Sequence, residues 1–171
     1  QDSIWEEGGV KLMLELLLRH PHLDFIDIGA NVGTYTMYVA ALGRFVLAID
    51  CFRPNLERLR RAIQLRNVGN RVVLVANALY TSSGKSLRLN PAERNVGGQS
   101  LETSPQNQTM PQREDDPYVV RTIQFDDVLP ILVDRQVRGA LLKMDIEGSE
   151  SFVVESGGRV FDTIDIPYVM M

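Results

Sequence analysis

The feature that most constrains the fold is a glycine-containing stretch directly after a short apolar run. The run covers residues 23–28, and the chain continues as Gly29-Ala30-Asn31-Val32-Gly33. Apolar side chains then recur at helical spacing over residues 32–42. This succession predicts a buried parallel strand, a turn that contains the glycines, and a helix. The start of such a helix presents unpaired N–H groups and the positive end of its dipole to a ligand in the turn.

The spacing of the glycines bears on the ligand. Dinucleotide-binding folds use Gly-x-Gly-x-x-Gly, whose middle glycine lets a pyrophosphate lie against the backbone. Asn31 occupies that middle position, so the pattern disfavours a pyrophosphate and with it an NAD-dependent oxidoreductase. Asp27, at the end of the strand, could accept a hydrogen bond from an ammonium group or a bridging water. The turn therefore favours a cofactor that has an amino-acid end.

Two further acidic positions follow predicted strands. The strand over residues 45–49 ends at Asp50, about twenty residues after the turn, where such folds place an acid that binds both ribose hydroxyls. The strand over residues 139–144 is apolar except for Lys143, and Asp145-Ile146-Glu147-Gly148 follows it. Open α/β sheets bind ligands at the carboxyl ends of their strands. We therefore expect these acids to face one pocket.

These three motifs, in this order, resemble the FkbM-type S-adenosylmethionine-dependent methyltransferases. They are D-I-G-A-N-V-G-T-Y-T at 27–36, the acid Asp50, and K-M-D-I-E-G-S-E at 143–150. The resemblance runs from about residue 24 to the C-terminus. It implies an α/β fold with a Rossmann-like, doubly wound, mostly parallel sheet of the class I methyltransferase type. One departure is Ile49-Asp50-Cys51, where the family usually has Phe-Glu-Pro; Asp keeps the charge of Glu but has a shorter reach.

The resemblance also implies the cofactor, the reaction and the residues that serve them. The cofactor would be S-adenosylmethionine, and the acceptor a hydroxyl of a small molecule or glycan. Asp145 would contact the polar end of the cofactor or acceptor, Glu147 would be the base or would orient the acceptor, and Lys143 would balance charge. The expected cofactor-binding residues are Asp27, Gly29, Ala30, Asn31, Gly33, Thr34, Asp50, Cys51, Asn77, Ala78 and Asp145, with Asn77 and Ala78 beside the adenine.

Several alternatives accompany these assignments. Lys143 and Glu147 could instead form an ion pair at the sheet edge, and Cys51 could simply pack at the strand end. Tyr35 could cap the methionine end of the cofactor or pack into the sheet. Asp145 and Glu147 could hold Mg²⁺, but the sequence offers no clear third ligand, so no metal site is predicted. His20 and His22 do not match a zinc site and are interpreted as surface residues, with a pocket edge as the alternative.

The remaining pattern alternates strands and helices, which predicts a parallel sheet with both faces covered. The long segment 90–117 is rich in Pro, Gln, Asn and acids, and we expect a flexible loop that is disordered or covers the acceptor, with a turn at 95–98. Helices are also expected at 4–19, with Leu12 and Leu16 in the apolar stripe, at 54–66, from Asp126 as N-cap, and from Glu150. Strands are expected at 71–76, 118–124 and 164–171. A turn at 82–85 is expected to close a hairpin with a strand at 86–89.

Composition favours a single enzyme domain over residues 1–171, with an N-terminal helix within residues 1–22. The chain has 171 residues, of which 44% are hydrophobic and 23% charged, enough to bury a core. The net charge of −4 gives no reason to expect a nucleic-acid partner, and the arginines at 58, 60, 61 and 66 are interpreted as a solvated helix face. No apolar run is long enough to span a bilayer.

The ends of the chain bear on its context. The sequence starts at Gln1 without an initiating Met and stops at Met171 within a predicted strand, and the family resemblance implies further strands beyond it. Compartment and oligomeric state stay open, with the cytoplasm slightly favoured over a secreted or membrane-anchored protein. The alternative function is a catalytically silent domain of the same fold that binds the cofactor or a partner.

Overall fold

The centre of the molecule is a five-stranded parallel sheet. A computed structural model describes residues 6–90, 100–102 and 116–171 of the chain. The strand order is β3-β2-β1-β8-β9, and every neighbouring pair is parallel. The chain thus runs outward from β1 and then returns to β8 on the other side of β1. The strands are β1 (Asp24–Ile28), β2 (Val46–Ile49), β3 (Val72–Val75), β8 (Gly139–Met144) and β9 (Asp165–Met170).

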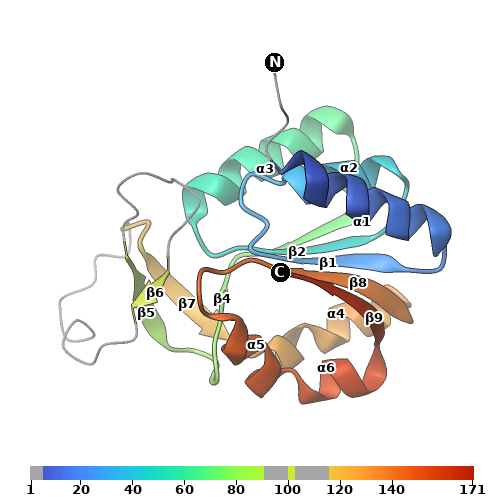
Figure 1. The fold of residues 1–171 in the computed structure, drawn as a ribbon. Helices are drawn as coiled ribbons and strands as arrows, with labels where there is room; N and C mark the ends of the chain where they lie inside the picture. The colour runs from blue at the N-terminus through green and yellow to red at the C-terminus, as the bar shows by residue number, and fades with distance from the viewer. Residues whose placement is uncertain (1–5, 91–99, 103–115) are drawn as a thin grey trace.

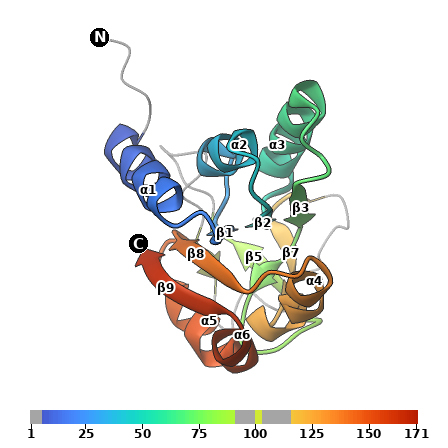
Figure 2. The same cartoon turned by 90° about the vertical axis from the view of Figure 1, so that its right-hand side faces the viewer.

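Helices cover both faces of this sheet, as Figures 1 and 2 show. One layer contains α1 (Glu7–Arg19), α2 (Thr34–Ala41) and α3 (Arg53–Arg66). The other contains α4 (Leu129–Asp134), α5 (Glu150–Ser156) and α6 (Gly158–Thr163). Each layer has its own core, the first around Met13, Leu17 and Leu59 and the second around Leu132 and Val153. The predicted doubly wound α/β fold is confirmed, and the ends of the expected strands shift by at most one residue.

A second, four-stranded sheet lies beyond the carboxyl ends of the first (Figure 1). Its order is β4-β7-β5-β6, so β7 separates β4 from β5, and the predicted hairpin ending in strand 86–89 is wrong. The turn residues at 82–85 indicate only that the chain reverses direction locally, whereas the pairing of β5 with β7 joins segments far apart in sequence. The strands are β4 (Ala78–Leu79), β5 (Ser86–Leu89), β6 (Leu101–Glu102) and β7 (Val119–Ile123).

Strand β6 lies within the segment 90–117 that is predicted as a loop, most of which falls outside the described residues. Leu101 and Glu102 pair antiparallel with Leu89 and Arg88 of β5. The predicted turn at 95–98 lies outside the described residues. A strand of two residues has no periodicity, so the sequence could not reveal it.

Two local helix predictions are also corrected. In α1 the buried residues are Val10, Met13 and Leu17, whereas Leu12 is 51% exposed. Leu16, the other residue predicted for the stripe, packs against the core, so the predicted stripe is confirmed at Leu16 and wrong at Leu12.

The predicted N-cap at Asp126 is wrong as well. A 3-10 turn over Phe125–Val128 precedes α4, and Gln124 is its N-cap residue. The Asp126 carboxylate instead accepts hydrogen bonds from the N–H groups of Arg159 (3.2 Å) and Val160 (3.0 Å) in the first turn of α6. It therefore caps a helix distant in sequence.

None of the described helices is both long and apolar enough to cross a membrane.

Candidate active site

A cavity of about 370 Å³ lies where the carboxyl ends of β1, β2 and β8 face the second sheet. Its wall combines the glycine turn, the ends of β2 and β8, the start of α3 and the second sheet. This position is the topological switch point, because the chain leaves β1 toward β2 on one side and β8 lies on the other. The residues that line the cavity include Glu6, Gly29, Ala30, Asn31, Thr34, Tyr35, Asp50, Cys51, Phe52, Asn55, Arg58, Asn77, Ala78, Leu79, Leu89, Leu101, Lys143, Asp145, Ile146 and Glu147.

The glycine turn has two different functions at its two glycines. Gly29 has φ +76° and lies against the backbone of Asp145, so that a Cβ atom would overlap the Asp145 carbonyl oxygen. Gly33 has φ +91°, and a Cβ atom there would overlap Leu59 of α3. Gly29 therefore allows β1 and β8 to end close together at the cavity, whereas Gly33 allows α3 to pack against the turn. Asn31 also has positive φ, +51°, a conformation that Asn tolerates better than most residues.

Asp50 connects the end of β2 to this turn. Its Oδ2 accepts a hydrogen bond from the Asn31 N–H at 2.8 Å, and its Oδ1 accepts one from the Phe52 N–H at 2.8 Å. Burial raises the pKa of Asp50, while these two hydrogen bonds lower it. Each carboxylate oxygen can accept more than one hydrogen bond. The carboxylate is therefore fixed in orientation and still able to accept hydroxyl groups from the cavity.

Lys143 lies at the centre of a charged cluster. It faces Asp27 across the β1–β8 ladder, and Asp145 follows two residues later on the same side. Its Nζ is 3.7 Å from Asp27 Oδ1 and 3.7 Å from Asp145 Oδ2, and donates to the Gly29 carbonyl at 3.3 Å. The Nζ also lies 5.1 Å from the centroid of the Tyr35 ring. The carboxylate partners of Lys143 are thus Asp27 and Asp145, so the alternative of an ion pair with Glu147 is wrong.

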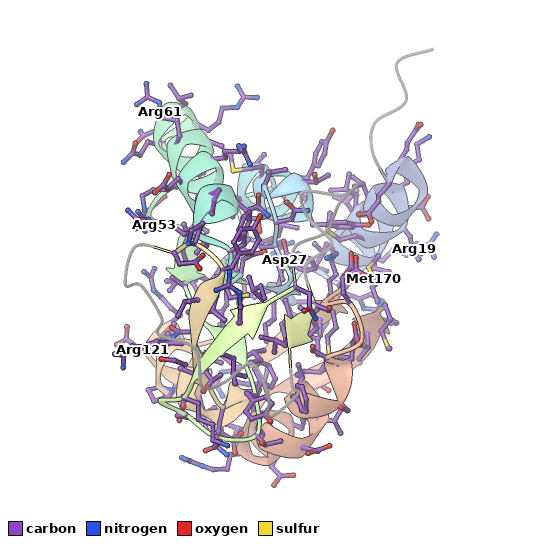
Figure 3. All side chains as sticks on the ribbon, turned by 90° about the vertical axis from the view of Figure 1, so that its left-hand side faces the viewer. Arg19, Asp27, Arg53, Arg61, Arg121 and Met170 are labelled. Carbon is purple, nitrogen blue, oxygen red and sulfur yellow. The ribbon has the colours of Figure 1, made fainter. Side chains whose placement is uncertain are left out.

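Asp27 belongs to this cluster but not to the cavity wall. Its side chain has 0% exposure, and Figure 3 shows it inside the molecule. Its Oδ2 accepts a hydrogen bond from the Thr36 hydroxyl at 2.6 Å. Burial raises the pKa of Asp27, while Lys143 and Thr36 act in the opposite direction. Asp27 is not accessible for the direct contact suggested with a ligand ammonium group, because its carboxylate is fully buried between Thr36 of α2 and Lys143 of β8.

Tyr35, in α2, is buried in the first core cluster and also lines the cavity. The packing role considered for it is therefore observed, and contact with the methionine end of a cofactor stays a prediction. Burial, followed by the neighbouring Glu6 carboxylate, raises the pKa of Tyr35 to about 12. Its hydroxyl therefore stays protonated at neutral pH.

The loop after β8 is held by a residue whose role the sequence did not reveal. Glu147 and Gly148 both have positive φ, +52° and +87°. The Glu150 Oε1 accepts hydrogen bonds from the N–H groups of Ile146 (3.1 Å) and Gly148 (3.4 Å). Glu150 was interpreted only as the start of a helix. An acid at a helix start that follows a glycine turn is the signal that could have indicated this contact.

The opposite wall contains residues that the sequence did not connect with the site. Phe52, Leu89 and Leu101 come from the end of β2 and from the second sheet. Arg58 also lines the cavity and donates to the Asn55 Oδ1 at 3.3 Å, and its side chain is exposed, as predicted for that face of α3. The other arginines of that face, at 60, 61 and 66, are exposed, and Arg61 points outward in Figure 3.

His20 lies near the other end of the sheet. Its Nε2 is 2.8 Å from the Tyr168 hydroxyl of β9, and neither it nor His22 is among the cavity residues. The described residues contain no group of three or more His, Cys, Asp or Glu side chains arranged to hold a metal ion.

Comparison with known proteins adds to this geometry. Residues 27–170 match the profile of the methyltransferase FkbM domain. The chain belongs to the FkbM methyltransferase family. It is also similar to the crystal structure of methyltransferase FkbM from Methylobacillus flagellatus KT, with 19% identity and a TM-score of 0.48. That match covers 80% of this chain and 29% of the other, and a search of curated protein sequences found no match.

In this FkbM domain, the predicted cofactor residues fall into two groups. All except Asp27 and Gly33 line the cavity within the described part of the chain. Asn77 is one of the lining residues, and its Nδ2 donates to the Arg121 carbonyl at 3.2 Å. Cys51 lines the cavity too, and burial, reinforced by Asp50, raises the pKa of its thiol to about 12. The three predicted reaction residues, Lys143, Asp145 and Glu147, all line the same cavity.

Proposed function

We propose that this FkbM-family domain is an S-adenosylmethionine-dependent methyltransferase that acts on a hydroxyl of a small molecule or glycan. The observation that carries the proposal is that the three family motifs line one cavity at the switch point of the sheet. The volume of about 370 Å³ falls within the range of roughly 300–1,000 Å³ found for small-molecule pockets.

The chemistry of the wall fits the parts of this cofactor in order. At the second sheet, Ala78, Leu89 and Leu101 offer apolar surface to the adenine. At the end of β2, the fixed carboxylate of Asp50 suits the ribose hydroxyls. Beyond Gly29, the Lys143–Asp145 pair offers charges of both signs to the amino-acid end. The proposed orientation therefore runs along the sheet edge from β4 to β8.

The bound cofactor supplies a methyl group on a positively charged sulfur, which is already electrophilic. The remaining task of the chain is to align the acceptor oxygen and accept its proton. Asp145 and Glu147 line the cavity and are exposed, so both are accessible to an acceptor. We assign acceptor orientation or proton acceptance to Glu147, contact with the polar end of the cofactor or acceptor to Asp145, and charge balance to Lys143.

Calorimetric titration with S-adenosylmethionine and S-adenosylhomocysteine tests the first part of the proposal. We expect micromolar binding that is weakened at least roughly tenfold by Asp50→Ala, because several charge-assisted hydrogen bonds are lost. Asp165→Ala removes an exposed carboxylate at the start of β9 and is the matched control, with no expected effect. If neither compound binds the unaltered chain, the proposal is wrong.

The second part concerns transfer. Incubation with cofactor that carries a radiolabelled methyl group, against a panel of sugars and small alcohols, should label at least one acceptor in a form resistant to mild base. Glu147→Gln should lower the rate with little change in cofactor affinity. Binding without any labelled product across the panel would favour the catalytically silent domain instead.

A further inference from the structure

The cavity wall contains a positive charge where a cationic cofactor is proposed to bind. Lys143 lines the cavity, and its side chain is 8% exposed. An ammonium group at this depth is poorly screened by solvent and would repel a sulfonium group close to it. Since the proposed cofactor passes over Gly29, whose carbonyl accepts a hydrogen bond from Lys143, the two positive charges would be near neighbours.

Lys143 has two carboxylate partners at the same distance but in different surroundings. Asp145 is 3.7 Å away and 51% exposed, so it is accessible to water and to ligands. Asp27 is also 3.7 Å away and has 0% exposure. The Asp27 Oδ1 that faces Lys143 accepts no hydrogen bond from the described residues. Its interaction with the chain is therefore mainly with the charge of Lys143.

We propose that Asp27 is a positioning residue that acts through Lys143: it is the buried counter-ion that cancels the lysine charge and so permits a sulfonium cofactor to bind beside it. This inference rests on the proposed function and deepens it. It gives the acid of the glycine motif a role without direct contact to the cofactor. Asp145 is then available to the ligand, because the lysine keeps a partner when Asp145 turns away.

A comparison of two ligands isolates this charge effect. S-adenosylmethionine and S-adenosylhomocysteine differ by one methyl group and by the positive charge on sulfur. A change that distorts the pocket weakens both ligands, whereas a change in local charge alters the ratio of their affinities. The ratio therefore distinguishes a counter-ion from a residue that only supports the fold.

The experiment is calorimetric titration of both ligands against the unaltered chain, Asp27→Asn and the double variant Asp27→Asn/Lys143→Met. Asp27→Asn keeps the shape and leaves the lysine charge without its buried partner. We expect affinity for S-adenosylmethionine to fall roughly tenfold more than affinity for S-adenosylhomocysteine. The double variant removes both charges, and we expect the ratio to return to within about threefold of the unaltered chain.

Asp24→Asn is the matched control, because it removes a carboxylate from the other end of the same strand, where Asp24 accepts the Phe45 N–H at 3.1 Å. It should leave the ratio unchanged. An unchanged ratio in Asp27→Asn, or a ratio that the double variant does not restore, would overturn the counter-ion role. If Asp27→Asn does not fold, the double variant alone still tests the inference, since a ratio far from that of the unaltered chain contradicts it. Failure of both ligands to bind the unaltered chain would instead contradict the proposed function.

Discussion

Cys51 illustrates how the surroundings of one side chain decide its chemistry. The thiol lines the cavity, yet burial and the neighbouring Asp50 raise its pKa to about 12. At pH 8 the thiolate fraction is then about three orders of magnitude below that of an ordinary cysteine with a pKa of about 8.5. We therefore expect iodoacetamide to modify Cys51 at least about a hundredfold more slowly in the folded chain than in urea, measured by mass spectrometry.

The same shift has a consequence for stability. The folded-state pKa of Cys51 is above the unfolded value, so the unfolded chain loses its thiol proton first as pH rises. This group therefore lowers the free energy of unfolding progressively between about pH 8.5 and pH 12. Fast alkylation of the folded chain at pH 8 would show that the pKa of the Cys51 thiol is not raised as described.

For some single residues, the contacts could not be predicted from the sequence. The spacing of the arginines in α3 predicts an exposed face but not which turn of that face borders the cavity, so it does not reveal that Arg58 lines the cavity as well as being exposed. Gly33 and Gly29 looked equivalent in the motif, although one contacts α3 and the other contacts the end of β8. Such distinctions depend on contacts between distant segments, which local patterns do not encode.

At the scale of elements, the connection between β1 and α2 depends on a close approach of two strand ends. Gly29→Ala would combine a positive φ with overlap of the Asp145 carbonyl oxygen, whereas Gly43→Ala has a similar φ of +86° and open space around it. We expect Gly43→Ala to cost about 1 kcal/mol from backbone strain alone and Gly29→Ala clearly more, measured by urea denaturation.

The two substitutions should also differ in their effect on cofactor affinity. Gly29→Ala should weaken cofactor binding, because the displaced end of β8 carries Asp145, whereas Gly43→Ala should leave it unchanged. Equal destabilisation by the two substitutions would mean that the β1 and β8 ends do not approach as closely as described.

The main strands and helices were predictable because buried parallel strands and amphipathic helices carry strong periodicity. In the second sheet, strands β5 and β7 were predicted, but β4, β6 and the strand order were not, since β4 and β6 have two residues each and the sheet pairs distant segments.

At the scale of the whole molecule, the cavity joins two sheets that share no strand. The main sheet supplies the glycine turn, Asp50 and Asp145, and the second sheet supplies Leu89 and Leu101. A ligand that spans this cavity contacts both. Strand β6 lies at the edge of its sheet and makes few backbone hydrogen bonds, so its amides should exchange through local opening.

Hydrogen exchange followed by mass spectrometry can test this coupling. At about 100 times the dissociation constant, binding stabilises the chain by about 2.7 kcal/mol, equivalent to roughly a hundredfold slower exchange for amides that require release of the ligand. We expect S-adenosylmethionine to slow exchange in β5 and β6 as well as in residues 29–34. Amides of α6, which lies on the far helix layer and lines no part of the cavity, should keep their local exchange rates. Protection limited to the glycine turn and the end of β2 would mean that the second sheet does not close the cofactor site, and the adenine would then have to lie against the main sheet alone.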